Sequence, residues 1–241
     1  MRQAPNREPL SKNGFFPYIG RMKGNRSVFR RLALLAVVGV AIPACGKGIR
    51  VSPTLFTDNF NGIFPGTSWT APALTGSAAV QIDSATGNPM PSLKMTTTAT
   101  ASTASTDTTT AFNNPNLTIS VHAAVLSATP SLAGTATISI VDATPAVIAS
   151  AAWDNATGNV TFTITGTAPV VVAAPAADGG FHRFVFNVSA GGTGSWSLDG
   201  GAAAITQAVA PGMLKVRLGA AFGAGTAWPD IFYDTVNVTS P

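Results

Sequence analysis

Residues 180–201 read GFHRFVFNVSAGGTGSWSLDGG and decide the fold of the chain. The first half has the two-residue period of a β-strand that turns an aromatic face toward a core, with one side carrying His182, Phe184, Phe186 and Val188. Small residues at 190–194 tolerate a positive φ angle and let the chain turn back. The returning strand contains Trp196 and ends in an Asp-Gly turn at 199–200. The stretch predicts an antiparallel hairpin in the middle of a large β-sandwich.

Similar strand-like runs follow one another along the rest of the chain. Turn-forming Gly, Pro, Asn and Asp residues separate them, and no stretch beyond residue 44 keeps a helical period over three turns. A Thr-rich stretch at 96–111 is interpreted as strand, loop and strand, because Thr is β-branched and favours strands. The thirteen predicted strands are 55–60, 79–83, 92–100, 107–112, 117–126, 135–141, 147–154, 159–165, 170–174, 181–189, 195–199, 214–222 and 231–239. This pattern predicts an all-β fold, an antiparallel two-sheet jelly-roll sandwich over residues 54–241.

Positive charge is concentrated at the N-terminus. Residues 1–44 hold eight basic residues against one acidic residue, a net charge of +7, whereas residues 45–241 carry −3. Because the predicted domain is acidic, we do not expect nucleic acid as a partner. Five basic residues at 21–31 precede an apolar run of thirteen residues, 32–44, which is too short to span a bilayer but fits a secretory signal. We therefore predict a signal-peptide helix within residues 1–44, with Met22 as an alternative start of translation.

Cys45 follows the apolar run directly and is the sole cysteine of the chain. The sequence IPACG at 42–46 resembles a bacterial lipobox, in which a small residue precedes the cysteine that receives lipid. The resemblance implies that Cys45 is lipidated, that residues 45–53 form a tether, and that the membrane is a partner through the N-terminal lipid. Gly46 stands where inner-membrane lipoproteins carry Asp, which implies location at the bacterial outer membrane or cell surface. Ordinary cleavage, giving a secreted or periplasmic protein, is the alternative.

Four pieces of the domain occur in the order and spacing of the concanavalin A-like lectin and glucanase superfamily, which includes laminin-G-like modules. They are FTDNFNG at 56–62, GFHR at 180–183, WSLDG at 196–200 and YDTVNV at 233–238. The chain resembles this superfamily over residues 54–240. The resemblance implies a jelly roll whose last strand lies beside its first. It does not define a function, since the fold serves lectins, hydrolases, lyases and adhesive modules.

The acidic residues that glycoside hydrolysis requires are scarce in the predicted domain. A retaining glycosidase needs two carboxyl groups about 5 Å apart, and the hydrolases of this superfamily carry two Glu and an Asp on one strand. The only glutamate is Glu8, within the predicted signal, and no two Asp residues stand two positions apart on one predicted strand. The sequence QID at 81–83 lacks the His that alginate lyases of this superfamily have in a similar string. We therefore expect a protein that is not an enzyme.

Two tryptophans that adjoin a turn and an acidic residue are the candidate ligand-binding positions. Trp153 precedes Asp154, and Trp228 lies two residues before Asp230. An aromatic ring stacks on the apolar face of a sugar while a nearby carboxylate accepts hydrogen bonds from its hydroxyls. The alternative is that each ring only covers an end of the sandwich.

The two histidines have structural interpretations. His182 shares its predicted face with Phe184, which favours a hydrogen-bonded core histidine over a ligand. His122 has no acidic residue near it in the sequence and receives no assignment. No cluster of His and Cys has the spacing of a transition-metal site.

Asp58 and Asp234 stand on terminal strands that the resemblance places close together. Alternation puts Asp58 with Phe56, and Asp234 with Val236, on the apolar side of those strands. An ionised carboxylate there is unfavourable by several kcal/mol unless it is paired or hydrogen-bonded. Backbone N–H donors, a raised pKa and a structural Ca²⁺ ion held by both carboxylates are the alternatives.

Together these patterns predict a surface lipoprotein whose sandwich binds a polysaccharide, another glycan or another surface without catalysis. A structural or adhesive envelope protein with no small ligand is the second hypothesis. A diverged polysaccharide hydrolase or lyase is the third.

Overall fold

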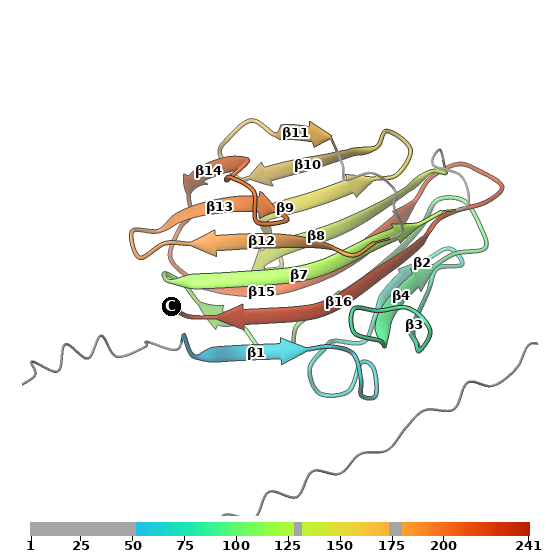
Figure 1. Cartoon of the computed structure of the whole chain (residues 1–241), viewed down its shortest axis with the longest axis horizontal. Coiled ribbons are helices and arrows are strands. Elements are labelled where there is room, and N and C mark those ends of the chain that lie inside the picture. The colour runs from blue at the N-terminus through green and yellow to red at the C-terminus, as the bar shows by residue number, and fades with distance from the viewer. Residues whose placement is uncertain (1–51, 128–131, 174–179) are drawn as a thin grey trace, which may run out of the picture. The chain divides into compact units, whose positions relative to one another are not determined.

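Two antiparallel sheets lie face to face in the part of the chain that the structure describes (Figure 1). This computed structural model describes residues 52–127, 132–173 and 180–241, so the predicted signal peptide and Cys45 lie outside it. Within these ranges the chain forms sixteen strands, and it contains no helix long and apolar enough to cross a membrane. The all-β, two-sheet sandwich predicted from the sequence is confirmed.

The sheet drawn in front in Figure 1, called the front sheet here, has the order β14-β13-β12-β7-β16-β4-β3, and β1 also pairs with β16. Its strands are β1 (Thr54–Asp58), β3 (Ala79–Asp83), β4 (Ser92–Thr96), β7 (Leu117–Leu126), β12 (His182–Val188), β13 (Thr193–Leu198), β14 (Ile205–Ala208) and β16 (Asp230–Thr239). The back sheet has the order β11-β10-β9-β8-β15-β5-β2, and β6 also pairs with β15. Its strands are β2 (Ala73–Thr75), β5 (Ser102–Asp107), β6 (Phe112–Asn113), β8 (Gly134–Asp142), β9 (Val147–Asp154), β10 (Asn159–Ile164), β11 (Val170–Ala173) and β15 (Met213–Phe222).

The stretch at 180–201 forms the predicted hairpin of β12 and β13. Phe186 pairs with Trp196 across the two strands, and their rings lie 5.0 Å apart between centroids. Both side chains are buried, as alternation predicts. The hairpin lies toward one edge of the front sheet, however, rather than in its middle, because only β14 separates β13 from that edge.

The two longest C-terminal strands complete the two sheets. In the front sheet β16 lies between β7 on one side and β4 and β1 on the other, which confirms that the last strand lies beside the first. In the back sheet β15 lies between β8 on one side and β5 and β6 on the other. Each sheet therefore owes its continuity to one of these two strands.

Tyr233 ties the sheets together inside the sandwich. It belongs to β16, it is fully buried, and its hydroxyl donates to the carbonyl oxygen of Gly219 on β15 at 2.5 Å. The same hydroxyl accepts a bond from the backbone N–H of Thr137 on β8 at 2.8 Å. Burial raises the pKa of Tyr233, so the phenol is neutral and keeps its proton for this bond.

Several strand boundaries differ from the prediction. The second strand of the Thr-rich stretch is β5 (Ser102–Asp107), where the sequence predicted 107–112. Its side chains at 102, 104 and 106 point inward and are buried. The two-residue period of a strand is therefore present here although the residues are small. The prediction missed β2, β6 and β14, each of four residues or fewer, because so short a strand shows hardly one alternation.

Candidate functional site

Trp153 does not provide a surface for sugar stacking. Only 4% of the residue is exposed, and its ring packs against His182 and Phe184, with centroid distances of 5.4 and 6.2 Å. The prediction of a ligand platform at Trp153 is wrong, because alternation along β9 turns this ring into the core. The neighbouring Asp154 accepts bonds from the backbone N–H of Ala156 and the hydroxyl of Thr157, both at 2.9 Å, and so stabilises the turn after β9.

Trp228 and Asp230 are also engaged within the domain. Trp228 is half-buried against the core, and its indole N–H donates to the carbonyl oxygen of Gly223 at 2.9 Å. The carboxylate of Asp230 lies 2.6 Å from the Nζ atom of Lys94. A ligand site at Trp228 and Asp230 stays a prediction. The carboxylate of Asp230 already has an ion-pair partner in Lys94.

His182 has the hydrogen-bonded, mostly buried position that the sequence favours. Its side chain is 12% exposed, and Nδ1 lies 2.8 Å from Oδ2 of Asp199 in the turn after β13. The other oxygen of Asp199 accepts a bond from the backbone N–H of Arg183 at 2.8 Å. Asp199 thus closes the open end of the hairpin.

Asp58 and Asp234 lie on opposite faces of the front sheet, which corrects the predicted arrangement. Asp58 points to the core side, where it accepts bonds from the backbone N–H of Phe60 at 2.7 Å and the indole N–H of Trp69 at 2.9 Å. Asp234 is fully buried, but on the outer face, because a β-bulge after it puts Val236 on the core side. A strict two-residue period cannot anticipate such a bulge.

Each of the two carboxylates has its own N–H donors. Asp234 accepts bonds from the backbone N–H groups of Asn88 and Thr235, the second at 2.6 Å. Among residues 52–127, 132–173 and 180–241, no three or more His, Cys, Asp or Glu side chains are grouped so that they could hold a metal ion. A Ca²⁺ ion shared by Asp58 and Asp234 therefore finds no support in this geometry.

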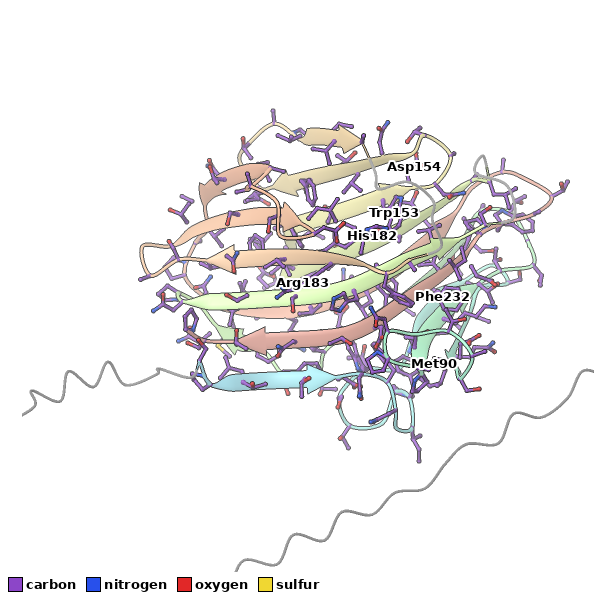
Figure 2. All side chains as sticks on the ribbon, viewed as in Figure 1. Met90, Trp153, Asp154, His182, Arg183 and Phe232 are labelled. Atoms are coloured by element: carbon purple, nitrogen blue, oxygen red, sulfur yellow. The ribbon has the colours of Figure 1, made fainter. Side chains whose placement is uncertain are left out.

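A row of three polar side chains crosses the outer face of the front sheet. Arg183 on β12 pairs directly with His122 on β7, and His122 pairs with Asp234 on β16. Their neighbours along each strand point into the core, so all three side chains project outward. Directly paired residues have Cβ atoms about 5 Å apart. The row thus runs from an exposed cation through a half-buried imidazole to a buried carboxylate, and Figure 2 labels Arg183 on β12.

The segment between β3 and β4 covers one end of this outer face. It binds β16 through Asn88, whose N–H donates to Asp234 and whose carbonyl oxygen accepts from the Thr235 hydroxyl. Phe232 is buried on the same face, and its ring centroid lies 5.5 Å from the Nζ atom of Lys94. Figure 2 labels Phe232 and also Met90, which belongs to the segment between β3 and β4. Outward residues of a sheet are usually exposed, so this face is partly shielded from solvent.

Buried polar atoms without hydrogen-bond partners gather on the same face. In the described ranges they include Nδ1 of His122, Oγ of Ser92 and Oδ1 of Asn237. Ser92 lies beside Asp234, since the next residue of β4 pairs with Tyr233, and Asn237 pairs with Ser120. An unsatisfied buried polar atom costs about 1–3 kcal/mol, so these atoms favour a bound water or a ligand group wherever one can reach them.

The electrostatics of the row keep His122 neutral. Burial is the main cause that lowers the pKa of His122, and the charge of Arg183 lowers it further. The carboxylates of Asp234 and Asp199 and a bond to the Thr235 backbone act in the opposite direction but do not prevail. A neutral imidazole has one donor and one acceptor nitrogen, which matches the hydroxyl group of a sugar.

Sequence reasoning missed His122 and Arg183 as site residues. His122 has no acidic neighbour in the sequence, because Asp234 is supplied by a strand more than a hundred residues later. One signal was present. His122 stands between Val121 and Ala123, which are core residues of the same strand. Alternation alone therefore predicts that the His122 side chain points to the outer face.

The sequence matches no protein-family model and no curated protein. Solved structures are similar in fold. The Emp47p carbohydrate recognition domain has a TM-score of 0.55 at 11% identity, covering 78% of this chain and 94% of that chain. The catalytic domain of an endo-1,3-β-glucanase (laminarinase) from Thermotoga petrophila RKU-1 has 0.52 at 12% identity, covering 79% and 99%. A protein of unknown function with a galectin-like fold from Bacillus subtilis has 0.54 at 10% identity, covering 78% and 96%.

The domain is a concanavalin A-like jelly roll. This is the fold that the resemblance of the four sequence pieces implies. At 10–12% identity the likeness concerns the concanavalin A-like fold alone.

Proposed function

We propose that this concanavalin A-like domain is a non-catalytic glycan-binding module of a surface lipoprotein, and that it binds the glycan on the outer face of the front sheet. The observation that carries the proposal is the group of buried, unpartnered polar atoms of Ser92, His122 and Asn237. Hydroxyl groups of a sugar are both donors and acceptors, so a sugar chain on this face can satisfy His122 and Asn237, whose side chains are partly exposed.

The positions of the carboxylates support binding over hydrolysis. Asp230 and Asp234 both face outward on β16, four residues and so about 13 Å apart along the strand. Glycoside hydrolysis needs two carboxyl groups about 5 to 9.5 Å apart. In addition, Asp230 is paired with Lys94, and Asp234 is buried among N–H donors.

Two further observations support the proposal. The structural neighbours include a carbohydrate recognition domain and the catalytic domain of an endo-1,3-β-glucanase, so the fold accommodates glycans in other proteins. The lipobox-like sequence around Cys45 fits a protein held at the bacterial outer membrane or cell surface, where polysaccharides are abundant partners.

A glycan array with the purified protein tests the proposal. We expect binding to at least one polysaccharide, and a loss of at least tenfold in affinity for His122→Ala and for Asn237→Ala. The matched control is Thr161→Ala, on the outer face of the back sheet, which should bind like the wild type. Melting curves verify that each variant is folded.

Three results would decide against the proposal. Failure to bind any glycan, together with a protein partner recovered by cross-linking, favours the structural or adhesive hypothesis. Release of sugar fragments from a bound polysaccharide favours a diverged hydrolase or lyase. Equal loss of binding in Thr161→Ala and His122→Ala means that the site is not on the front sheet.

A further inference from the structure

Arg183 is the exposed cation of the polar row. Its backbone N–H is bound by Asp199, but its guanidinium group has no ion pair with an acidic side chain of the described residues. Two other cations of the domain are paired: Lys94 lies 2.6 Å from Asp230, and Arg217 forms two bonds with Asp107 at 2.7 and 2.9 Å. The charge of Arg183 therefore faces solvent over the proposed glycan site.

The acidic groups around Arg183 already have partners. Asp234 is fully buried and accepts bonds from Asn88 and Thr235. Asp199 binds the ring of His182 and the backbone of Arg183. Both carboxylates keep their charge but already have their own donors, so the guanidinium group of Arg183 is left to pair with a carboxylate from a ligand.

We propose that the glycan bound here is acidic, with a sugar carboxylate that pairs with the Arg183 guanidinium group beside His122. This inference rests on the proposed function and names its ligand class. The planar guanidinium group matches a carboxylate with two parallel hydrogen bonds, which a lysine cannot reproduce. The neutral imidazole of His122 then serves an adjacent hydroxyl.

The pairing also couples binding to protonation. His122 is faced by Arg183 from β12, by Asp234 and Thr235 from β16, and by Asp199 from the turn after β13. The charge of Arg183 disfavours the imidazolium form. A bound carboxylate cancels that charge and so raises the affinity of His122 for a proton. By linkage, an acidic glycan binds more tightly as the pH falls from 7.5 to 5.5.

Polygalacturonate and its fully methyl-esterified form are the matched probes, because they differ only in the carboxylate. We expect the wild type to bind polygalacturonate at least tenfold more tightly than the ester at low ionic strength. Arg183→Gln should abolish this preference, and Arg183→Lys should recover only part of it. Lys215→Gln, a cation on the outer face of the back sheet, is the control and should keep the preference.

The outcomes separate this inference from the proposed function. Equal binding of both polymers, with a loss in His122→Ala but none in Arg183→Gln, overturns the acidic ligand and keeps glycan binding. Equal weakening by Arg183→Gln and Lys215→Gln means that only the overall charge matters, and also overturns it. Binding of dextran sulfate as tight as that of polygalacturonate overturns carboxylate recognition. Binding to no polysaccharide at all refutes both proposals.

Discussion

His122 and Asp234 lie directly opposite one another on β7 and β16, immediately before the β-bulge of the last strand. Thr235, the next residue, has a φ angle of 43°, and two residues of β16 face one residue of β7 there. The bulge turns Val236 inward while it leaves Asp234 outward. This local irregularity places a carboxylate beside an imidazole on the outer face.

The acid stability of the domain should depend on His122. Its pKa in the folded protein is below the ordinary value of 6.5, so the unfolded chain binds the proton more readily. The unfolding free energy is therefore unaffected above pH 6.5 and decreases as the pH falls below it, through the folded-state pKa. Denaturant titrations at pH 7.5 and 5.5 should show a smaller loss for His122→Gln than for the wild type. Equal losses in both proteins would contradict the buried, neutral histidine.

Gly194 in β13 should not tolerate a methyl group. A Cβ atom there would lie 2.5 Å from Cγ2 of Val209 and 3.0 Å from Cζ of the buried Phe186. Overpacking of this kind costs about 1–3 kcal/mol, so Gly194→Ala should melt at a temperature lower by roughly 3–10 °C. Gly212→Ala is the control, because no atom lies within 4 Å of its Cβ position. A wild-type melting temperature for Gly194→Ala would show that this end of the core is loosely packed.

Calcium should have no effect on the stability of the domain. The carboxylates of Asp58 and Asp234 face opposite sides of the sheet and are bound by N–H donors, so an ion would have to displace those bonds. We expect the same melting temperature with Ca²⁺ and with a chelator. A bound ion at a hundredfold excess over its Kd would instead add about 2.7 kcal/mol. A rise in melting temperature that Asp58→Asn removes would restore the predicted calcium site.

Lipidation should occur at Cys45. Metabolic labelling with a palmitate analogue is expected to mark the wild type and not Cys45→Ala, because the sequence contains no other cysteine. The unlabelled variant should keep its glycan affinity, since the proposed site belongs to the front sheet. Label in both proteins, or in neither, would mean that the lipobox interpretation of residues 42–46 is wrong.

The fold is predictable from the sequence wherever strands are long and their period is regular. The hairpin at 180–201 shows this best. Phe184 and Phe186 alternate with other residues, so the face of the strand that carries them must be the buried one. Short strands such as β14 and the shifted start of β5 are set by their partners in the sheet, and those contacts are not local.

The candidate site was much harder to predict. Trp153 looked like a sugar platform because it adjoins a turn, but its position on β9 buries it. His122, Arg183 and Asp234 form a site only through the register of three strands that are far apart in sequence. The sequence predicted that Asp234 and Val236 share one face, but the bulge at Thr235 puts them on opposite faces of the sheet. Register between distant strands is not encoded in local spacing.

The position of β15 and β16 bears on the order in which the domain assembles. Until residues 213–239 are available, each sheet exists as two separate halves whose facing edges lack a neighbour. Folding must therefore wait for the last strands, and the pairs that close the sheets join residues far apart in the chain, which slows folding. The sandwich therefore closes only once β15 and β16 have paired with their neighbours.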